Sequence, residues 1–210
     1  PGTAWIRNPT NDGNKSPIKN VYASSQKNYT DVGSAYWGPT ELVANNVNII
    51  RFSDILLWEA ECKADAGDLV GAMADVNKVR SRMKDHPEAW VKKGGTYTAG
   101  AAVFTGGTDA DTYNIGLYAS FPDKAFATKA IQMERRLELA MEGHRFFDLV
   151  RWGIAATTIN TFIQREKSFR PLKKNAVFVA GKNEYMPIPQ AEIDKMNSDG
   201  TGRLVQNPGY

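Results

Sequence analysis

The chain has 210 residues, a hydrophobic content of 42%, a charged content of 23% and a formal net charge of +3. This composition is typical of a globular protein and not of a disordered one, and the net charge is too small to indicate nucleic-acid binding. No apolar run approaches the length of about 18 residues that a membrane-spanning helix needs. The single cysteine, Cys62, leaves neither a disulfide framework nor a cysteine metal site.

The chain starts at Pro1, without an initiator methionine, a charged start or an apolar leader segment. A targeting signal would need these features. We therefore expect a processed or truncated piece of a longer protein, in which any signal or lipid anchor belongs to the missing front part.

Residues 1–47 are rich in Asn, Gly, Pro, Ser, Thr and Tyr and keep no helical or strand periodicity. Such composition is typical of turns and loops. The segment also carries large aromatic residues such as Trp5, Tyr22 and Trp37, which a linker does not need. An irregular but ordered, aromatic-rich segment is predicted.

Residues 49–83 have the pattern of a helical hairpin. From 49 to 66 the apolar residues leave only a thin polar stripe, which predicts a helix that is buried on most sides. Gly67 is a typical helix end and Asp68 a typical N-cap, and apolar residues then recur at helical spacing from Leu69 to Met83. The short connection predicts two antiparallel helices, about the length of one tetratricopeptide repeat.

Residues 84–122 form a long insertion with several glycines and five large aromatic residues. A loop of this length inside a compact domain is usually functional or disordered. The aromatic residues argue against disorder, and they are Trp90, Tyr97, Phe104, Tyr113 and Tyr118.

Residues 123–163 return to helical periodicity, with helices predicted from Asp123 to Gly143, from His144 to Trp152 and over 154–162. In 164–210, the alternation over 176–188 around a glycine turn predicts a small β-hairpin, followed by one helical turn at 189–196 and a polar tail. The predicted fold class is mainly α, with tetratricopeptide-like helical hairpins, long irregular loops and a small β-hairpin. Residues 1–210 are expected to form a single domain portion.

The stretch 134–153 combines charges of both signs with large hydrophobic residues. Glu134, Glu138 and Glu142 fall at helical spacing, roughly 6 Å apart on one face, and such a row repels itself unless cations pair with it. The first hairpin offers Arg51 and Arg80 together with Arg82, so interhelical ion pairs are expected. The predicted structural charge cluster comprises Glu134, Arg135, Arg136, Glu138, His144, Arg145, Asp148 and Arg151.

Three catalytic or metal interpretations compete with that structural one. The carboxylate spacing fits the pair of a glycosidase. Carboxylates on one helix, however, all lie on the same side of a substrate and do not flank its scissile bond from both sides. His144 and Asp148 have the spacing of a general-base pair, yet no nucleophile accompanies them. Asp109 and Asp111 resemble part of a calcium loop that lacks its bidentate glutamate. No catalytic residue, metal site or cofactor is predicted.

Aromatic residues of the loops remain as candidates for ligand binding. Aromatic rings stack on the C–H faces of sugars or on nucleic-acid bases. Because no basic residues are interleaved with these rings, a sugar is favoured over a nucleic acid as the ligand. The alternative is that each ring only anchors its own loop to the helical core. The candidate ligand-binding residues are Trp37, Trp90, Tyr97 and Tyr113.

Five blocks of sequence, in this order and spacing, resemble the SusD/RagB family over residues 49 to the end. They are RFSDILLWEAE (51–61), AMADVNKVRSR (72–82), ERRLELAMEGHRFFDLVRWG (134–153), YMPIPQ (185–190) and QNPGY (206–210). The chain is thereby identified as similar to the carboxyl-terminal part of such a protein. The family's binding residues vary in type and position, so none is assigned by motif.

The resemblance implies a mostly α, non-enzymatic surface lipoprotein of Bacteroidetes-type outer membranes. It also implies binding of an oligosaccharide or other nutrient, and delivery of that ligand to a SusC-like TonB-dependent transporter. Membrane contact is expected only through a lipid anchor that this chain lacks. The anchoring cysteine and most of the upstream helical repeats are absent, and the insertion at 84–122 is longer than the family pattern leads us to expect. The two rival hypotheses are a helical-repeat scaffold for protein partners and a glycoside hydrolase.

Overall fold

The computed structural model describes residues 19, 30–31, 42–43, 48–98 and 103–210. The prediction of a mainly α fold is confirmed. The α-helices in the described part are α2 (Phe52–Asp65), α3 (Leu69–Lys84), α4 (Lys124–Glu138), α5 (His144–Arg151), α6 (Ala155–Glu166) and α7 (Gln190–Met196). The chain divides into two compact units, Pro17–Gly143 and Pro1–Ser16 with His144–Tyr210, and each is described by itself. That residues 1–210 form one domain portion stays a prediction.

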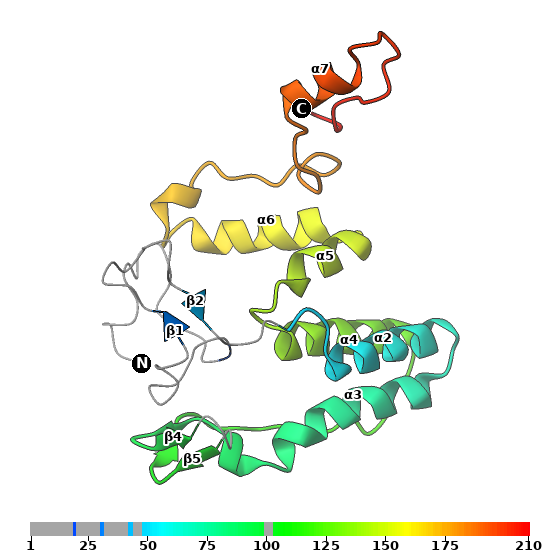
Figure 1. Ribbon diagram of the computed structural model, residues 1–210. Coiled ribbons are helices and arrows are strands. Elements are labelled where there is room, and N and C mark those ends of the chain that lie inside the picture. Colours follow the sequence, from blue (N-terminus) through cyan, green and yellow to red (C-terminus); the bar gives the residue numbers. More distant parts are fainter. Residues whose placement is uncertain (1–18, 20–29, 32–41, 44–47, 99–102) are drawn as a thin grey trace. The chain divides into compact units, whose positions relative to one another are not determined.

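Helices α2 and α3 form the predicted antiparallel hairpin, and α4 packs beside them (Figure 1). The turn between α2 and α3 is closed by Gly67, whose φ of +88° lies in the left-handed region that favours glycine. Asp68 is the N-cap of α3, as predicted, because its side chain accepts a hydrogen bond from the Gly71 amide at 2.8 Å. The predictions of a helix end at Gly67 and of an N-cap at Asp68 are therefore confirmed.

The core of the first unit lies where α2, α3 and α4 meet. Alanines at the crossing let the helices approach closely, and larger aliphatic side chains fill the remaining space. The most buried apolar members are Leu57, Ala60, Ala72, Val76, Ala127 and Ile131.

Helix α2 differs from its prediction in two ways. It begins at Phe52 and not at residue 49, because Arg51 has an extended backbone and serves as its N-cap. It is also not buried on most sides: Ile55 and Trp58 are exposed, and Phe52 is 65% exposed. Only the face toward α3 and α4 is covered among the described residues.

The sequence predicts that helix α4 ends at Gly143, but in the structure it ends at Glu138. Met141 has a φ of +67° and Gly143 a φ of +86°, so the backbone turns into the left-handed region and a right-handed helix cannot continue. Glu142 therefore lies in a turn beyond the helix, and not on the helical face that carries Glu134.

The insertion at 84–122 is more regular than predicted. It contains a short 3-10 helix at Pro87–Ala89 and two antiparallel ladders. Strand β3 (Lys92–Lys93) pairs with β6 (Thr108–Asp109), and β4 (Thr96–Thr98) pairs with β5 (Val103–Thr105). A further short pair joins β1 (Thr30–Asp31) to β2 (Leu42–Val43).

The β-hairpin that the sequence predicts over 176–188 is not present. Residues 180–184 form consecutive turns, and residues 176–188 contain no strand. The Val179 amide donates to the side chain of Asn183 at 2.6 Å, and the Asn183 amide donates back to the Val179 carbonyl at 3.0 Å. A side chain of this kind satisfies the backbone locally, so it competes with cross-strand pairing. The predicted helical turn at 189–196 is present as α7.

In the described part of the chain, four side-chain amides hold irregular segments in place. Each donates to the carbonyl and accepts from the amide of a single residue, at 2.7 to 3.0 Å, and we call this arrangement an amide bridge. An amide bridge satisfies both backbone groups of its target, as one pair in a β-ladder does. The bridges join Asn77 to Tyr118, Asn160 to Phe178, Gln206 to Ile188 and Asn197 to Leu204.

Candidate functional site

The carboxylates of Glu134 and Glu138 on α4, and of Glu142 in the turn after it, are paired with arginines at α2 and α3. Arg80 Nη1 contacts Glu134 Oε2 at 2.6 Å, and Arg82 Nη2 contacts Glu138 Oε1 at 2.7 Å. Arg51 reaches both Glu138 and Glu142, with 2.7 Å from its Nε to Glu142 Oε2. The expected interhelical ion pairs are therefore present, and they link α4 and its following turn to α2 and α3.

One further partner, Lys19, is not predicted by any pattern in the sequence. Its ammonium group donates to the carbonyl of Glu138 at 2.7 Å, to the carbonyl of Ala140 at 3.1 Å and to Glu142 Oε1 at 2.5 Å. These carbonyls lie at the carboxyl end of α4, where helical partners are lacking and a positive charge is favourable. Lys19 lies in a segment without periodicity, so no sequence pattern could have singled it out.

A second, drier ion pair lies deeper in the same unit. Arg135 Nη1 contacts Asp54 Oδ1 at 2.7 Å, and the two side chains are 1% and 0% exposed. The Trp58 ring lies 5.7 Å from the Arg135 guanidinium carbon, within cation–π range. Arg135 was predicted as a cluster member, whereas Asp54 was missed, although an acidic residue inside an apolar helical stretch was a usable signal. Arg136 is exposed on the surface of α4.

The remaining predicted cluster members belong to the second unit, at or near α5. Asp148 is buried and accepts from Arg151 Nε at 2.9 Å. Arg145 and Arg151 lie 5.9 Å and 4.8 Å from the Trp152 ring, so this indole is flanked by two guanidinium groups. His144 is the first residue of the helix. An arginine bonded to Asp148 makes this carboxylate a poor partner for a histidine base.

The ionisation of the cluster follows from burial and pairing. Burial raises the pKa of Glu134 above its ordinary value, despite the nearby Arg80. Burial also opposes ionisation of Glu142, but hydrogen bonds from Arg51 and Lys19 outweigh it and lower the pKa of Glu142. For Arg51, burial is outweighed by hydrogen bonds to Glu142 and Glu138, which raise its pKa. Arg51 and Glu142 therefore both carry their charges at neutral pH.

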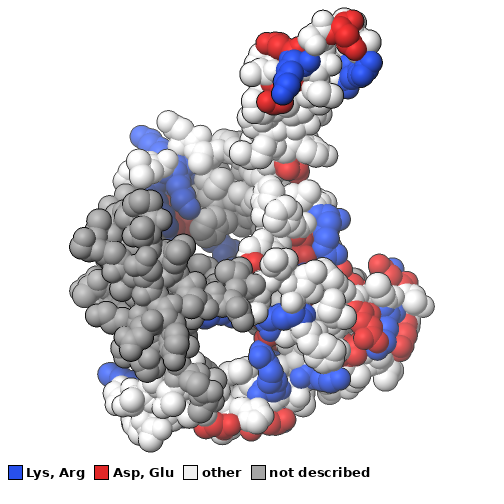
Figure 2. Space-filling view, in the orientation of Figure 1, with Lys and Arg blue, Asp and Glu red and all other residues white. Residues whose placement is uncertain are grey.

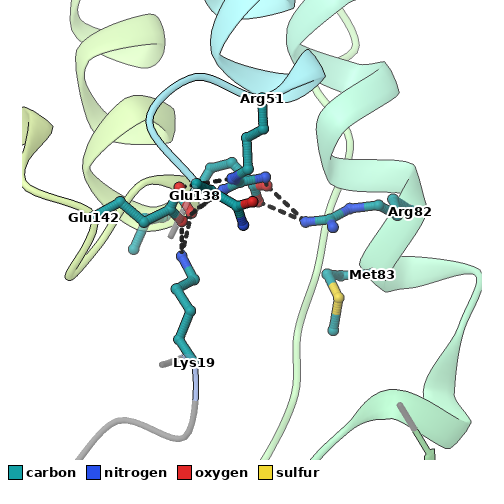
Figure 3. A pocket seen from close by; sticks show the side chains of 8 residues that line it. Lys19, Arg51, Arg82, Met83, Glu138 and Glu142 are labelled. Carbon is teal, nitrogen blue, oxygen red and sulfur yellow. Dashed lines mark hydrogen bonds and ion pairs between the residues drawn. The ribbon is translucent and has the colours of Figure 1, made fainter. Parts of the chain in front are cut away.

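A pocket of about 390 Å³ opens beside these ion pairs (Figure 3). Asn48 and Leu137 contribute to its wall. The other lining side chains, which Figure 3 labels, are Lys19, Arg51, Arg82, Met83, Glu138 and Glu142. Figure 2 shows Lys and Arg side chains gathered on the face of this unit where α3 runs alongside α2 and α4.

Two of the candidate aromatic residues meet close to this pocket. The rings of Trp90 and Tyr113 lie 5.0 Å apart at an angle of 33°, and both residues are half-buried. Trp90 Nε1 donates to the Met83 carbonyl at 2.7 Å, and Tyr113 donates to the Val91 carbonyl at 3.2 Å. Since Met83 also lines the pocket, the aromatic pair is fastened to the same end of α3.

The other two candidates are not part of this pair. Tyr97 lies on β4 opposite Phe104 of β5, with 4.9 Å between their ring centroids, and it is exposed. Trp37 lies outside the described residues. Asp109 forms an ion pair with Lys92, and the described residues contain no group of three or more His, Cys, Asp or Glu side chains able to hold a metal ion. No described helix is long and apolar enough to cross a membrane.

Comparison with known proteins gives consistent matches. The model of the SusD family matches residues 2–210. A SusD-like protein of Formosa agariphila is 30% identical over 175 residues, which cover 80% of this chain and 25% of the relative. A crystal structure of a SusD superfamily protein from Bacteroides vulgatus ATCC 8482 superposes with a TM-score of 0.51 at 23% identity, and covers 79% of this chain and 28% of that chain. The chain spans about a quarter of the length of these relatives.

Proposed function

Because the chain belongs to the SusD family, whose members are generally non-catalytic binding proteins, we propose that it binds a glycan at the cell surface. The protein would pass its oligosaccharide or other nutrient ligand to a SusC-like TonB-dependent transporter of the outer membrane. In the intact protein a lipid anchor would hold it at that membrane.

The observation that carries this proposal is the contact between the tilted rings of Trp90 and Tyr113. Both rings have their polar atoms bonded to backbone carbonyls, so the orientation of each ring is fixed before a ligand arrives. Both residues keep part of their surface accessible. A rigid aromatic surface stacks on the C–H face of a sugar at little entropic cost.

The arrangement of the carboxylates supports binding over hydrolysis. Glu134 is bonded to Arg80, and Glu138 and Glu142 share Arg51. A glycosidase needs one carboxylic acid and one carboxylate on opposite sides of the scissile bond. Carboxylates that are held by arginines on one wall do not provide that arrangement.

Isothermal titration calorimetry with a panel of neutral oligosaccharides tests the proposal. Trp90→Ala should weaken binding by about fivefold, since an aromatic contact contributes on the order of 1 kcal/mol. Phe169→Ala, which removes an exposed ring in the second unit, is the matched control and should leave the affinity unchanged. Trp37→Ala and Tyr97→Ala examine the other two candidates in the same way.

Two results would count against the proposed function. One is the absence of heat with every sugar of the panel while circular dichroism shows a folded protein. The other is the appearance of new reducing ends when the protein is incubated with polysaccharides, which would indicate hydrolysis.

A further inference from the structure

The guanidinium of Arg82 is only partly used inside the protein. Its Nη2 donates to both oxygens of Glu138, at 2.7 and 2.9 Å. Its Nε and Nη1 donate to none of the described residues. By contrast, Arg51 uses all three of its nitrogens, and the ammonium of Lys19 has three oxygen partners. Arg82 therefore keeps free N–H donors at the pocket.

In the pocket, the carboxylates are nearly buried, whereas two of the cationic side chains are accessible. The side chains of Glu138 and Glu142 are 9% and 5% exposed, whereas those of Lys19 and Arg82 are 36% and 54% exposed. Three cationic side chains in the lining face these two carboxylates, so the lining carries a net positive charge. A ligand that enters the pocket meets the cations first, and each carboxylate is already matched by two cations.

The pocket also has the size and the walls for part of a sugar. Its volume of about 390 Å³ falls within the range of small-molecule sites. Met83 and Leu137 add apolar surface and Asn48 adds an amide, beside the exposed guanidinium. The backbone of Met83 also anchors the indole of Trp90, which places the aromatic pair next to the pocket.

We propose that this pocket binds the anionic substituent of an acidic sugar, a carboxylate or a sulfate ester, through the guanidinium of Arg82. The inference rests on the proposed function, because it names the class of glycan that would be bound. A guanidinium with free N–H groups forms short, charge-assisted hydrogen bonds to such anions. The carboxylate or ester would lie against Arg82, while the sugar ring packs on Met83 and Leu137.

Titration with glucuronate, glucose 6-sulfate and glucose tests this assignment. Each sugar is added to the wild-type protein, to Arg82→Gln, and to Arg136→Gln as the matched control, because Arg136 is an exposed arginine outside the pocket. At least one of the two anionic sugars should bind better than glucose, and the pair tells carboxylate from sulfate ester. Arg82→Gln should weaken that binding by about tenfold, and Arg136→Gln by less than about twofold.

A second variant covers the case in which Arg82→Gln disturbs the fold through Glu138. Leu137→Trp fills the pocket without removing a charge, and Leu137 is already exposed on α4. It should also abolish the preference for the anionic sugar. Equal binding of the anionic sugar to wild type, Arg82→Gln and Leu137→Trp would overturn the assignment.

The inference and the proposed function fail in different ways. If neutral oligosaccharides bind in a manner that depends on Trp90, and anionic sugars bind no better than glucose, the pocket assignment is wrong and glycan binding stands. If no sugar of either panel binds to the folded protein, glycan binding itself is wrong.

Discussion

Arg135 and Asp54 form an ion pair at 2.7 Å in which neither side chain is more than 1% exposed. The pair joins α4 to α2 in the interior of the first unit, beside the Trp58 ring. Desolvation of two charges is costly, so such a pair adds little net stability compared with apolar side chains of similar volume. Removal of one partner alone leaves a buried charge, and that is strongly unfavourable.

This gives the first prediction. Arg135→Met alone should lower the free energy of unfolding by about 3–5 kcal/mol, and the double variant Asp54→Leu, Arg135→Met should recover most of that loss. Urea unfolding followed by far-UV circular dichroism measures both. Losses that simply add in the double variant would show that the two charges do not depend on each other.

The second prediction concerns how the contribution of Glu142 to stability depends on pH. Pairing lowers the pKa of Glu142 below its ordinary value of 4.5, so the ionised group adds stability at and above that pH. This contribution is lost as the pH falls through the lowered pKa of the folded state. The stability difference between wild type and Glu142→Gln should be about 1–3 kcal/mol at pH 7 and should shrink below a pH of about 4.

Glu134→Gln provides the matched comparison, because burial raises the pKa of Glu134. A raised pKa gives the opposite dependence of stability on pH. The contribution of Glu134 to stability is complete below the pKa of the unfolded state and is lost as the pH rises through the pKa of the folded state. Urea unfolding between pH 3.5 and 7 gives the stability difference between wild type and each variant. This difference should change with pH in opposite directions for the two variants. A change in the same direction would contradict the assigned pKa shifts.

The third prediction tests the amide bridge from Asn77 to Tyr118, whose two hydrogen bonds are both 2.8 Å long. Asn77→Asp keeps the shape of the side chain but turns its donor into an acceptor that faces the Tyr118 carbonyl. The loss should be about 1–3 kcal/mol. Hydrogen exchange at the Tyr118 amide should speed up, whereas Asn114→Asp, an exposed asparagine in the same insertion, should leave it unchanged.

The sequence allowed prediction where the signal is local. The apolar spacing of Leu69 to Met83 and the cap at Asp68 define α3 because both act within a few residues. The pairing of Glu134 and Glu138 with arginines was also predictable, because a row of like charges on a helix has to be neutralised.

The errors have more than one cause, and contact over long separations in the chain is one of them. Lys19 meets Glu142 across 123 residues, and no periodicity marks such a partner. The sequence predicts that α4 continues to Gly143 because Met141 suits a helix, yet the backbone of Met141 is left-handed in the fold. The alternation over 176–188 predicts strands, but the side chains of Asn183 and Asn160 satisfy that backbone instead. The roles of Trp90, Tyr97 and Tyr113 stay predictions, as does that of Trp37.

The amide bridges have a consequence for how such a protein can diversify. The bridge from Asn77 fixes Tyr118, near the end of the insertion, to α3, and the hydrogen bond from Trp90 to the Met83 carbonyl fixes the start of the insertion to the same helix. The entropy of closing a loop grows slowly with its length, by about 0.6 kcal/mol for each doubling. The chain between the two anchors can therefore lengthen, shorten or change composition while the helical core beneath it keeps its sequence. One scaffold can thus acquire new ligand specificities through changes in the sequence of the segment between two anchored residues.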